Sequence, residues 1–304
     1  MFARPFALCL TLPALRRAGG VAAVALLLAL LAARAAASPA PGSAAATPAR
    51  VFLEDYTWTE VRDAVRGGAT TAIVPIGGTE QSGPAIALGK HNARVRLLSE
   101  RIARALGNAI VAPVVAYVPE GNIDPPSSHM RFAGTISVPP ALFEAYLEAI
   151  AGSLRAAGFR DIVLLGDHGG YQAQLGHVAG RLNHEWSAGP ARVHAPAAYY
   201  RAATEGYARL LREHGVRDDE IGTHAALADT SLQMAVDPAM VRSDVLQAGG
   251  RLDASVGIYG GDPRRASAEL GQLGLDLIVH ETVPAIREAI AAALRGPPAA
   301  HAAR

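Results

Sequence analysis

The residues most able to do chemistry in this chain are four scattered acids and histidines. Glu80 lies in the glycine-rich segment 77–84, and His168 is followed directly by two glycines. His91 and Asp229 add a further imidazole and a further carboxylate. Nitrogen and oxygen donors of these kinds suit zinc, manganese and similar divalent ions. Their wide spacing along the chain means that only the fold can bring them together.

Each of these positions also has a plain structural interpretation. A Gly/Pro-rich segment such as 77–84 is more commonly a surface turn. It is not a P-loop, because the Lys-Ser/Thr ending is missing, and it is not a nucleophile elbow, because no glycine stands two residues before Ser82. His168 could instead cap a turn, His91 lies in a segment typical of an exposed loop, and Asp229 could cap a helix.

Three further histidines have less distinctive surroundings. His129 shortly precedes the Phe-Ala-Gly-Thr sequence at 132–135, and it is either another cleft residue or a plain loop histidine. His177 and His184 share one face of an expected helix, so we predict that they lie on the helix surface and do not bind a ligand.

Short apolar runs alternate with stretches of helical periodicity between residues 51 and 295. This pattern predicts strands at 71–76, 109–118 and 161–165, and helices at about 95–106, 140–157 and 172–185. The apolar stripe of the second helix is expected to consist of Leu142, Tyr146, Ile150 and Leu154. Strands separated by helices of this length indicate an α/β fold with a mostly parallel sheet.

The order of these elements is a reason to consider two of the reactive residues together. In open α/β sheets, ligands bind outside the carboxyl ends of the strands. Glu80 follows the first predicted strand and His168 follows the third. Both side chains should therefore lie at the same edge of the sheet.

The composition excludes several other classes of protein. The chain has 28 Lys+Arg against 27 Asp+Glu, and no long basic block, so nothing indicates binding to nucleic acid. Its single cysteine, Cys9, excludes an intramolecular disulfide framework and any multi-cysteine zinc cluster.

The first residues have the pattern of a secretory signal peptide. Residues 1–37 contain arginines and no acid. Most of these arginines precede the apolar run 21–33, and small residues follow that run, as in a secretory signal peptide. An uncleaved anchor is the alternative, although this apolar run is short for a membrane span. We expect a flexible linker at 38–50, one folded domain at 51–295 and a disordered tail at 296–304. The protein would then be exported, periplasmic or secreted, with no stable membrane association once the leader is removed.

Several ordered motifs resemble the creatininase (creatinine amidohydrolase) family over roughly residues 58–293. The resemblance rests on the segments 75–84, 88–89, 128–137, 157–170, 224–231 and 257–271. It implies a three-layer α/β/α sandwich with a mostly parallel sheet, assembled as a homo-oligomer. It also implies a divalent-metal site that hydrolyses cyclic or linear amides.

The chain departs from the family pattern at several positions, among them 166–171, where the pattern around His168 is changed, and 224–231, where one glutamate is lost. Three departures affect the expected ligands most. Ser82 stands where the family has a histidine ligand, His91 stands where it has an aspartate that bridges two metals, and Asp229 replaces a longer glutamate. An imidazole cannot bridge two cations as a carboxylate does. The resemblance with these changes therefore implies at most one metal ion.

The predicted ligands of that ion are Glu80, His91 and His168, with Asp229 as a fourth ligand or just outside. Zinc is favoured and manganese is the alternative. His129 or Asp229 is expected to position the substrate or carry a proton.

The resemblance thus implies a metal-dependent amidohydrolase that acts on a small molecule with a non-peptide, cyclic amide C–N bond. The alternative is a catalytically degenerate relative that binds a small molecule or serves as a structural oligomer subunit, because a fold does not guarantee its chemistry. Metal content distinguishes these functions: tightly held zinc or manganese favours catalysis.

Overall fold

A four-stranded parallel sheet lies at the centre of the computed structural model, which describes residues 50–295. The strand order is β2-β1-β3-β4. The strands are β1 (Thr71–Ile76), β2 (Ala109–Val111), β3 (Asp161–Gly166) and β4 (Arg192–His194). The predicted leader 1–37, nearly all of the linker 38–50 and the tail 296–304 lie outside the described residues.

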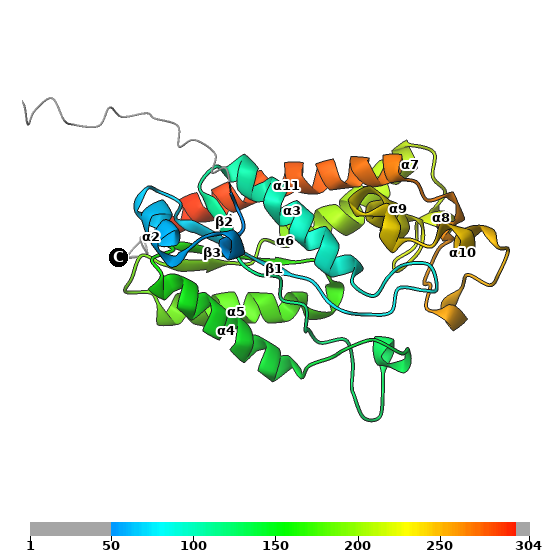
Figure 1. Ribbon diagram of the computed structural model, residues 1–304, viewed down its shortest axis with the longest axis horizontal. Helices are drawn as coiled ribbons and strands as arrows, with labels where there is room; N and C mark the ends of the chain where they lie inside the picture. Colours follow the sequence, from blue (N-terminus) through cyan, green and yellow to red (C-terminus); the bar gives the residue numbers. More distant parts are fainter. Residues whose placement is uncertain (1–49, 296–304) are drawn as a thin grey trace, which may run out of the picture. The chain divides into compact units, whose positions relative to one another are not determined.

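Different helices cover the two faces of this sheet, as Figure 1 shows. The long helices α3 (Lys90–Leu106) and α11 (Ala268–Arg295) cover one face, and α4 (Pro140–Ala156) and α5 (Gln172–Glu185) cover the other. The shorter helices are α2 (Trp58–Arg66), α6 (Ala197–Arg201), α7 (Tyr207–Glu213), α8 (Asp218–Ile221), α9 (Leu227–Val236) and α10 (Ser243–Gln247). The α/β/α sandwich predicted from the sequence is confirmed.

The burial of β1 explains why its sequence is continuously apolar instead of alternating. All six residues of β1 are buried. Val74 and Ile76 pack into the core beneath α4 and α5, whereas Ile73 packs into the core beneath α3 and α11. Successive side chains of a strand point to opposite faces, so a strand covered on both faces needs apolar residues throughout.

Two details of the predicted elements are wrong. The strand predicted at 109–118 ends at Val111, and after it only isolated bridges continue toward the site, at Val115 and Val118. In α4, Leu142 and Tyr146 are 58% and 51% exposed, respectively.

The core face of α4 is formed instead by Phe143, Leu147, Ala151 and Leu154. The first three residues of this set repeat the predicted spacing of four but lie one position later, whereas Leu154 belongs to both sets. The predicted Ile150 is partly buried against the same core. The sequence contained two adjacent apolar faces, and contact with the sheet selects between them.

No helix among residues 50–295 combines the length and the apolar character that a membrane span needs. The signal peptide and the export of the protein stay predictions.

Close packing of α9 against α11 gives a testable consequence. A Cβ added at Gly271 would collide with the backbone carbonyl of Ser231, whereas a Cβ at Gly176 on α5 would meet nothing. We expect Gly271→Ala to lower the free energy of unfolding by about 1–3 kcal/mol. The matched variant Gly176→Ala should raise it by up to about 1 kcal/mol. Urea unfolding followed by circular dichroism measures both, and equal effects would show that the helices are not packed this closely.

Candidate metal centre and its charge ring

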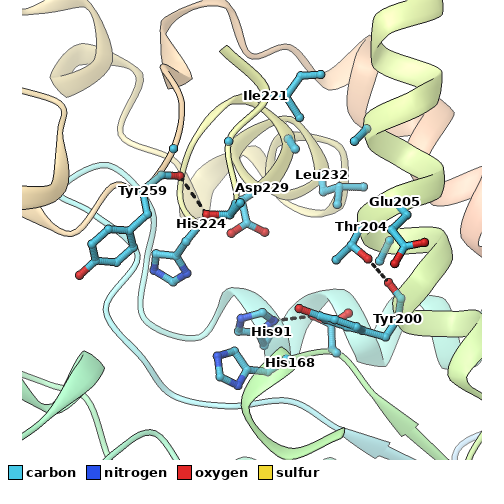
Figure 2. Close-up of a pocket in the computed structure, with 18 of the residues that line it drawn as sticks. His91, His168, Tyr200, Thr204, Glu205, Ile221, His224, Asp229, Leu232 and Tyr259 are labelled. Atoms are coloured by element: carbon cyan, nitrogen blue, oxygen red, sulfur yellow. Dashed lines mark hydrogen bonds and ion pairs between the residues drawn. The ribbon is translucent and has the colours of Figure 1, made fainter. Parts of the chain in front are cut away.

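The reactive residues predicted from the sequence meet at the carboxyl edge of the sheet. Glu80 follows β1, His168 follows β3, and His91 lies in the first turn of α3. The rings of His91 and His168 have their centroids 5.1 Å apart. Figure 2 shows both rings beside one pocket, with His224 on the opposite wall.

Four side chains form a compact set of possible metal ligands, here called the donor cluster: Glu80, Glu120, His129 and His168. One ligand atom from each lies within 4.8 Å of all the others. Glu80 Oε2 is 3.2 Å from both His129 Nε2 and His168 Nε2. Glu120 Oε2 is 3.6 Å from His168 Nε2.

The donor cluster contains buried carboxylate oxygens that have no hydrogen bond within the described part of the chain. Glu80 Oε2 and both oxygens of Glu120 are buried without a hydrogen bond. Burial, and then the charge of Glu80, raise the pKa of Glu120 to about 9. Without a cation Glu120 is therefore a neutral acid beside the Glu80 carboxylate. Because buried polar groups are normally paired, the cluster fits a divalent ion with nitrogen and oxygen ligands.

Local backbone geometry holds the cluster in place. His129 comes from the short helical turn Ser128–Arg131, and its Nδ1 lies 3.0 Å from the side-chain nitrogen of Gln81. The backbone N–H of Gly170 donates to His168 Nδ1 at 3.1 Å. Both rings therefore present Nε2 to Glu80.

Beside the donor cluster, five buried side chains and the partly buried Asp229 form a closed ring of hydrogen bonds and ion pairs, here called the charge ring. In order around the ring they are Glu80, Lys90, Asp229, Arg94, Asp167 and His91. All the contacts between neighbours are between 2.6 and 3.3 Å. Three members, at 90, 91 and 94, belong to the first turns of α3.

The charge ring determines the ionisation of its acids. Burial opposes the negative charge of Glu80, but Lys90, His168 and His91 hold its pKa well below the usual range. Burial likewise opposes the charge of Asp229, and Lys90 and Arg94 hold its pKa well below the usual range. Both acids are therefore carboxylates at neutral pH.

The site residues predicted from the sequence are divided between the donor cluster and the charge ring. Glu80 and His168 belong to the donor cluster, as does His129, which was expected to handle the substrate or a proton. His91 and Asp229, predicted as ligands, lie outside the cluster: both His91 nitrogens face carboxylate oxygens at 2.7 Å, and Asp229 binds Lys90 and Arg94.

Two local interpretations from the sequence are wrong. His91 is not in an exposed loop but is 4% exposed in α3. The segment 77–84 is not a surface turn, because Glu80, Gln81 and Ser82 are all buried.

The sequence analysis missed Glu120. It follows the strand predicted at 109–118 by two residues, so the rule that ligands lie at the carboxyl ends of strands could have found it. The predicted helix-surface residues His177 and His184 are exposed on α5.

Two cavities meet at the donor cluster, because His129 and His168 line both of them. The first, of about 820 Å³, extends past Tyr200 and Tyr259 (Figure 2). The second, of about 700 Å³, is lined by Glu120. A molecule bound at the cluster can therefore extend in two directions.

The fold and the donor cluster together define an α/β/α protein with a candidate metal site at the carboxyl edge of its sheet. The profile of the creatininase family, described as creatinine amidohydrolase, matches residues 54–286. The chain belongs to the creatininase family, a family of hydrolases.

Solved creatininases have the same fold. A creatinine amidohydrolase (creatininase) has a TM-score of 0.65 at 22% identity, over 83% of this chain and 100% of that chain. A structure described as creatininase Mn has a TM-score of 0.64 at 23% identity, over 79% and 99%. A mutant creatininase described as the Zn-Zn type has a TM-score of 0.65 at 23% identity, over 80% and 99%.

Two curated relatives match shorter stretches. A 3-dehydro-scyllo-inosose hydrolase from Thermotoga maritima is 28% identical over 123 residues, which are 40% of this chain and 37% of the relative. A mycofactocin precursor peptide peptidase from Mycobacterium tuberculosis is 27% identical over 188 residues, which are 59% and 63%. The matches span less than two thirds of either relative.

The charge ring predicts unequal roles for two arginines of α3. Arg94 is 4% exposed and binds Asp167 and Asp229, whereas Arg104 forms an exposed pair with Glu100. We expect Arg94→Met to lower the free energy of unfolding by about 3–5 kcal/mol, because it leaves buried carboxylates uncompensated. Arg104→Met should lower it by less than about 1 kcal/mol. Urea unfolding of both variants measures this difference, and similar losses would contradict a buried ring.

Proposed function

We propose that this protein is a metal-dependent amidohydrolase that cleaves a non-peptide amide C–N bond. The observation that carries the proposal is the donor cluster, in which buried carboxylate oxygens without hydrogen bonds among residues 50–295 face two imidazoles where two cavities meet. Membership of the creatininase family supports the same chemistry. Solved creatininases described as manganese and zinc forms support one of these metals here.

The residues that would hold one ion are Glu80, His129 and His168, and Glu120 lies beside them as the acid that would handle protons. Such an ion activates water and polarises an amide carbonyl. Glu120 lines the second cavity and has no protein hydrogen bond. A divalent cation beside Glu120 would favour its carboxylate form over the neutral acid. In that form Glu120 could take a proton from the attacking water and pass it to the leaving nitrogen, which amide hydrolysis requires.

We propose a cyclic amide as the substrate, as the family resemblance implies. The substrate-binding surfaces would be the two cavities, since His129 and His168 place the donor cluster between them. Cavities of about 820 and 700 Å³ leave room for substituents larger than a single small ring. A ring substituted on both sides of the scissile bond fits this arrangement better than a compact one.

The metal centre is tested by His168→Ala with His184→Ala as the matched control, since His184 is exposed on α5. We expect His168→Ala to lose the bound zinc or manganese and any hydrolysis of lactams or cyclic ureas, because it removes one of the two imidazole donors. His184→Ala should keep both. Elemental analysis of purified protein and an assay for the ring-opened product measure these results. Metal and activity that survive in His168→Ala would refute the proposed centre.

A substrate panel tests the finer proposal. The experiment compares kcat/KM among lactams and cyclic ureas of three kinds: those with no substituent, with one substituent, and with substituents on both sides of the amide. Each buried methylene contributes about 0.8 kcal/mol, so several added carbons should raise kcat/KM at least about tenfold. Turnover of linear peptides alone, or fastest turnover of the unsubstituted rings, would contradict a doubly substituted cyclic substrate.

A further inference from the structure

Lys90 is the only lysine among the 304 residues, and its side chain is completely buried. It is the first residue of α3, where the helix dipole disfavours a cation, and no acid in the first turn compensates it. A buried charge is costly unless it is paired. The surroundings of this ammonium must therefore explain its position.

Three acceptors surround Lys90 Nζ. It lies 2.6 Å from Asp229 Oδ2, 3.3 Å from Glu80 Oε1 and 3.5 Å from His224 Nδ1. An ammonium has three N–H donors, so each has a partner. The His224 ring is oriented by its Nε2, which lies 3.0 Å from the carbonyl oxygen of Gln81. A carbonyl oxygen only accepts, so Nε2 carries the ring proton, and the neutral Nδ1 accepts from the ammonium.

The groups around Lys90 Nζ are also those that bind divalent ions. Two carboxylate oxygens and a neutral imidazole nitrogen form a common ligand set for zinc. Two of these atoms, Glu80 Oε1 and His224 Nδ1, are only 3.6 Å apart. A metal ion is smaller than the whole lysine side chain. If that side chain were removed, such an ion could bind at the same place.

Glu80 connects this place to the donor cluster. Its Oε1 faces Lys90, and its Oε2 faces His129 and His168. The carboxylate thus lies between two adjacent cation positions. The chain itself fills one of them with the only lysine it has.

We propose that the Lys90 ammonium is a permanent cation at the position of a second divalent ion, so that the protein takes up one exchangeable ion and not two. This inference rests on the proposed metal centre but concerns a separate position beside it. Lys90 is therefore a positioning residue that determines how many metal ions bind.

Metal content tests the inference directly. The purified protein and its variants are equilibrated with Zn²⁺, passed through gel filtration and analysed for zinc per chain. Lys90→Ala removes the charge and opens the space, so we expect one more zinc ion per chain than in the wild type. Lys90→Met removes the charge but still fills the space, so we expect no additional ion. Unchanged zinc in Lys90→Ala, an added ion in Lys90→Met, or two ions in the wild type would each overturn the inference.

Thermal unfolding keeps the test decisive if Lys90→Ala folds poorly. Both variants leave Glu80 and Asp229 without their cation, so both should melt below the wild type in the absence of metal. Because an ion that binds only the folded state stabilises it, Zn²⁺ should raise the Tm of Lys90→Ala more than the Tm of Lys90→Met. Equal increases would overturn the inference.

A double variant separates this inference from the proposed function. Lys90→Ala combined with His168→Ala should retain about one zinc ion per chain, held at the former ammonium position. A wild type without zinc and a Lys90→Ala protein with one ion would refute the catalytic centre and support the role of Lys90. One ion in both proteins would support the centre and refute the role of Lys90.

Discussion

The arrangement of the site depends on the charge ring that closes around the start of α3. Lys90, His91 and Arg94 project from its first turns and bind acids that follow β1, follow β3 and lie in α9. These acids come from segments far apart in the sequence. The ring therefore connects the edge of the sheet to α9 and gives the site its fixed geometry.

Buried ion pairs are weak contributors to stability, because desolvation offsets most of the attraction between the charges. Apolar side chains of similar volume would hold α3 against the sheet about as well. What they could not do is orient a carboxylate. With Oε1 of Glu80 held by Lys90 at 3.3 Å and by His91 at 2.7 Å, its Oε2 can only face the donor cluster. The charge ring is thus better explained by orientation than by stability.

Much of the fold could be predicted from the sequence, because β1 and β3 are buried on both faces and so appear as continuous apolar runs. The carboxyl-end rule likewise placed Glu80 and His168 at one edge. The core face of α4 could not be chosen, since two apolar faces had equal spacing. Lys90 was not recognised, because a lone lysine beside a histidine resembles a solvated loop until its distant partners Glu80 and Asp229 are in place.

The departures from the family pattern form one coherent change when they are viewed in the structure. Where the family has an aspartate that bridges two metals, this chain has His91, whose two nitrogens bind Glu80 and Asp167. Where the family has a histidine ligand, it has Ser82, which is buried and whose hydroxyl has no partner among the described residues. Both changes remove ligands from a second ion, and Lys90 supplies a cation beside them. A site with a fixed positive charge at this place does not need those ligands, so the two substitutions do not by themselves imply a loss of activity.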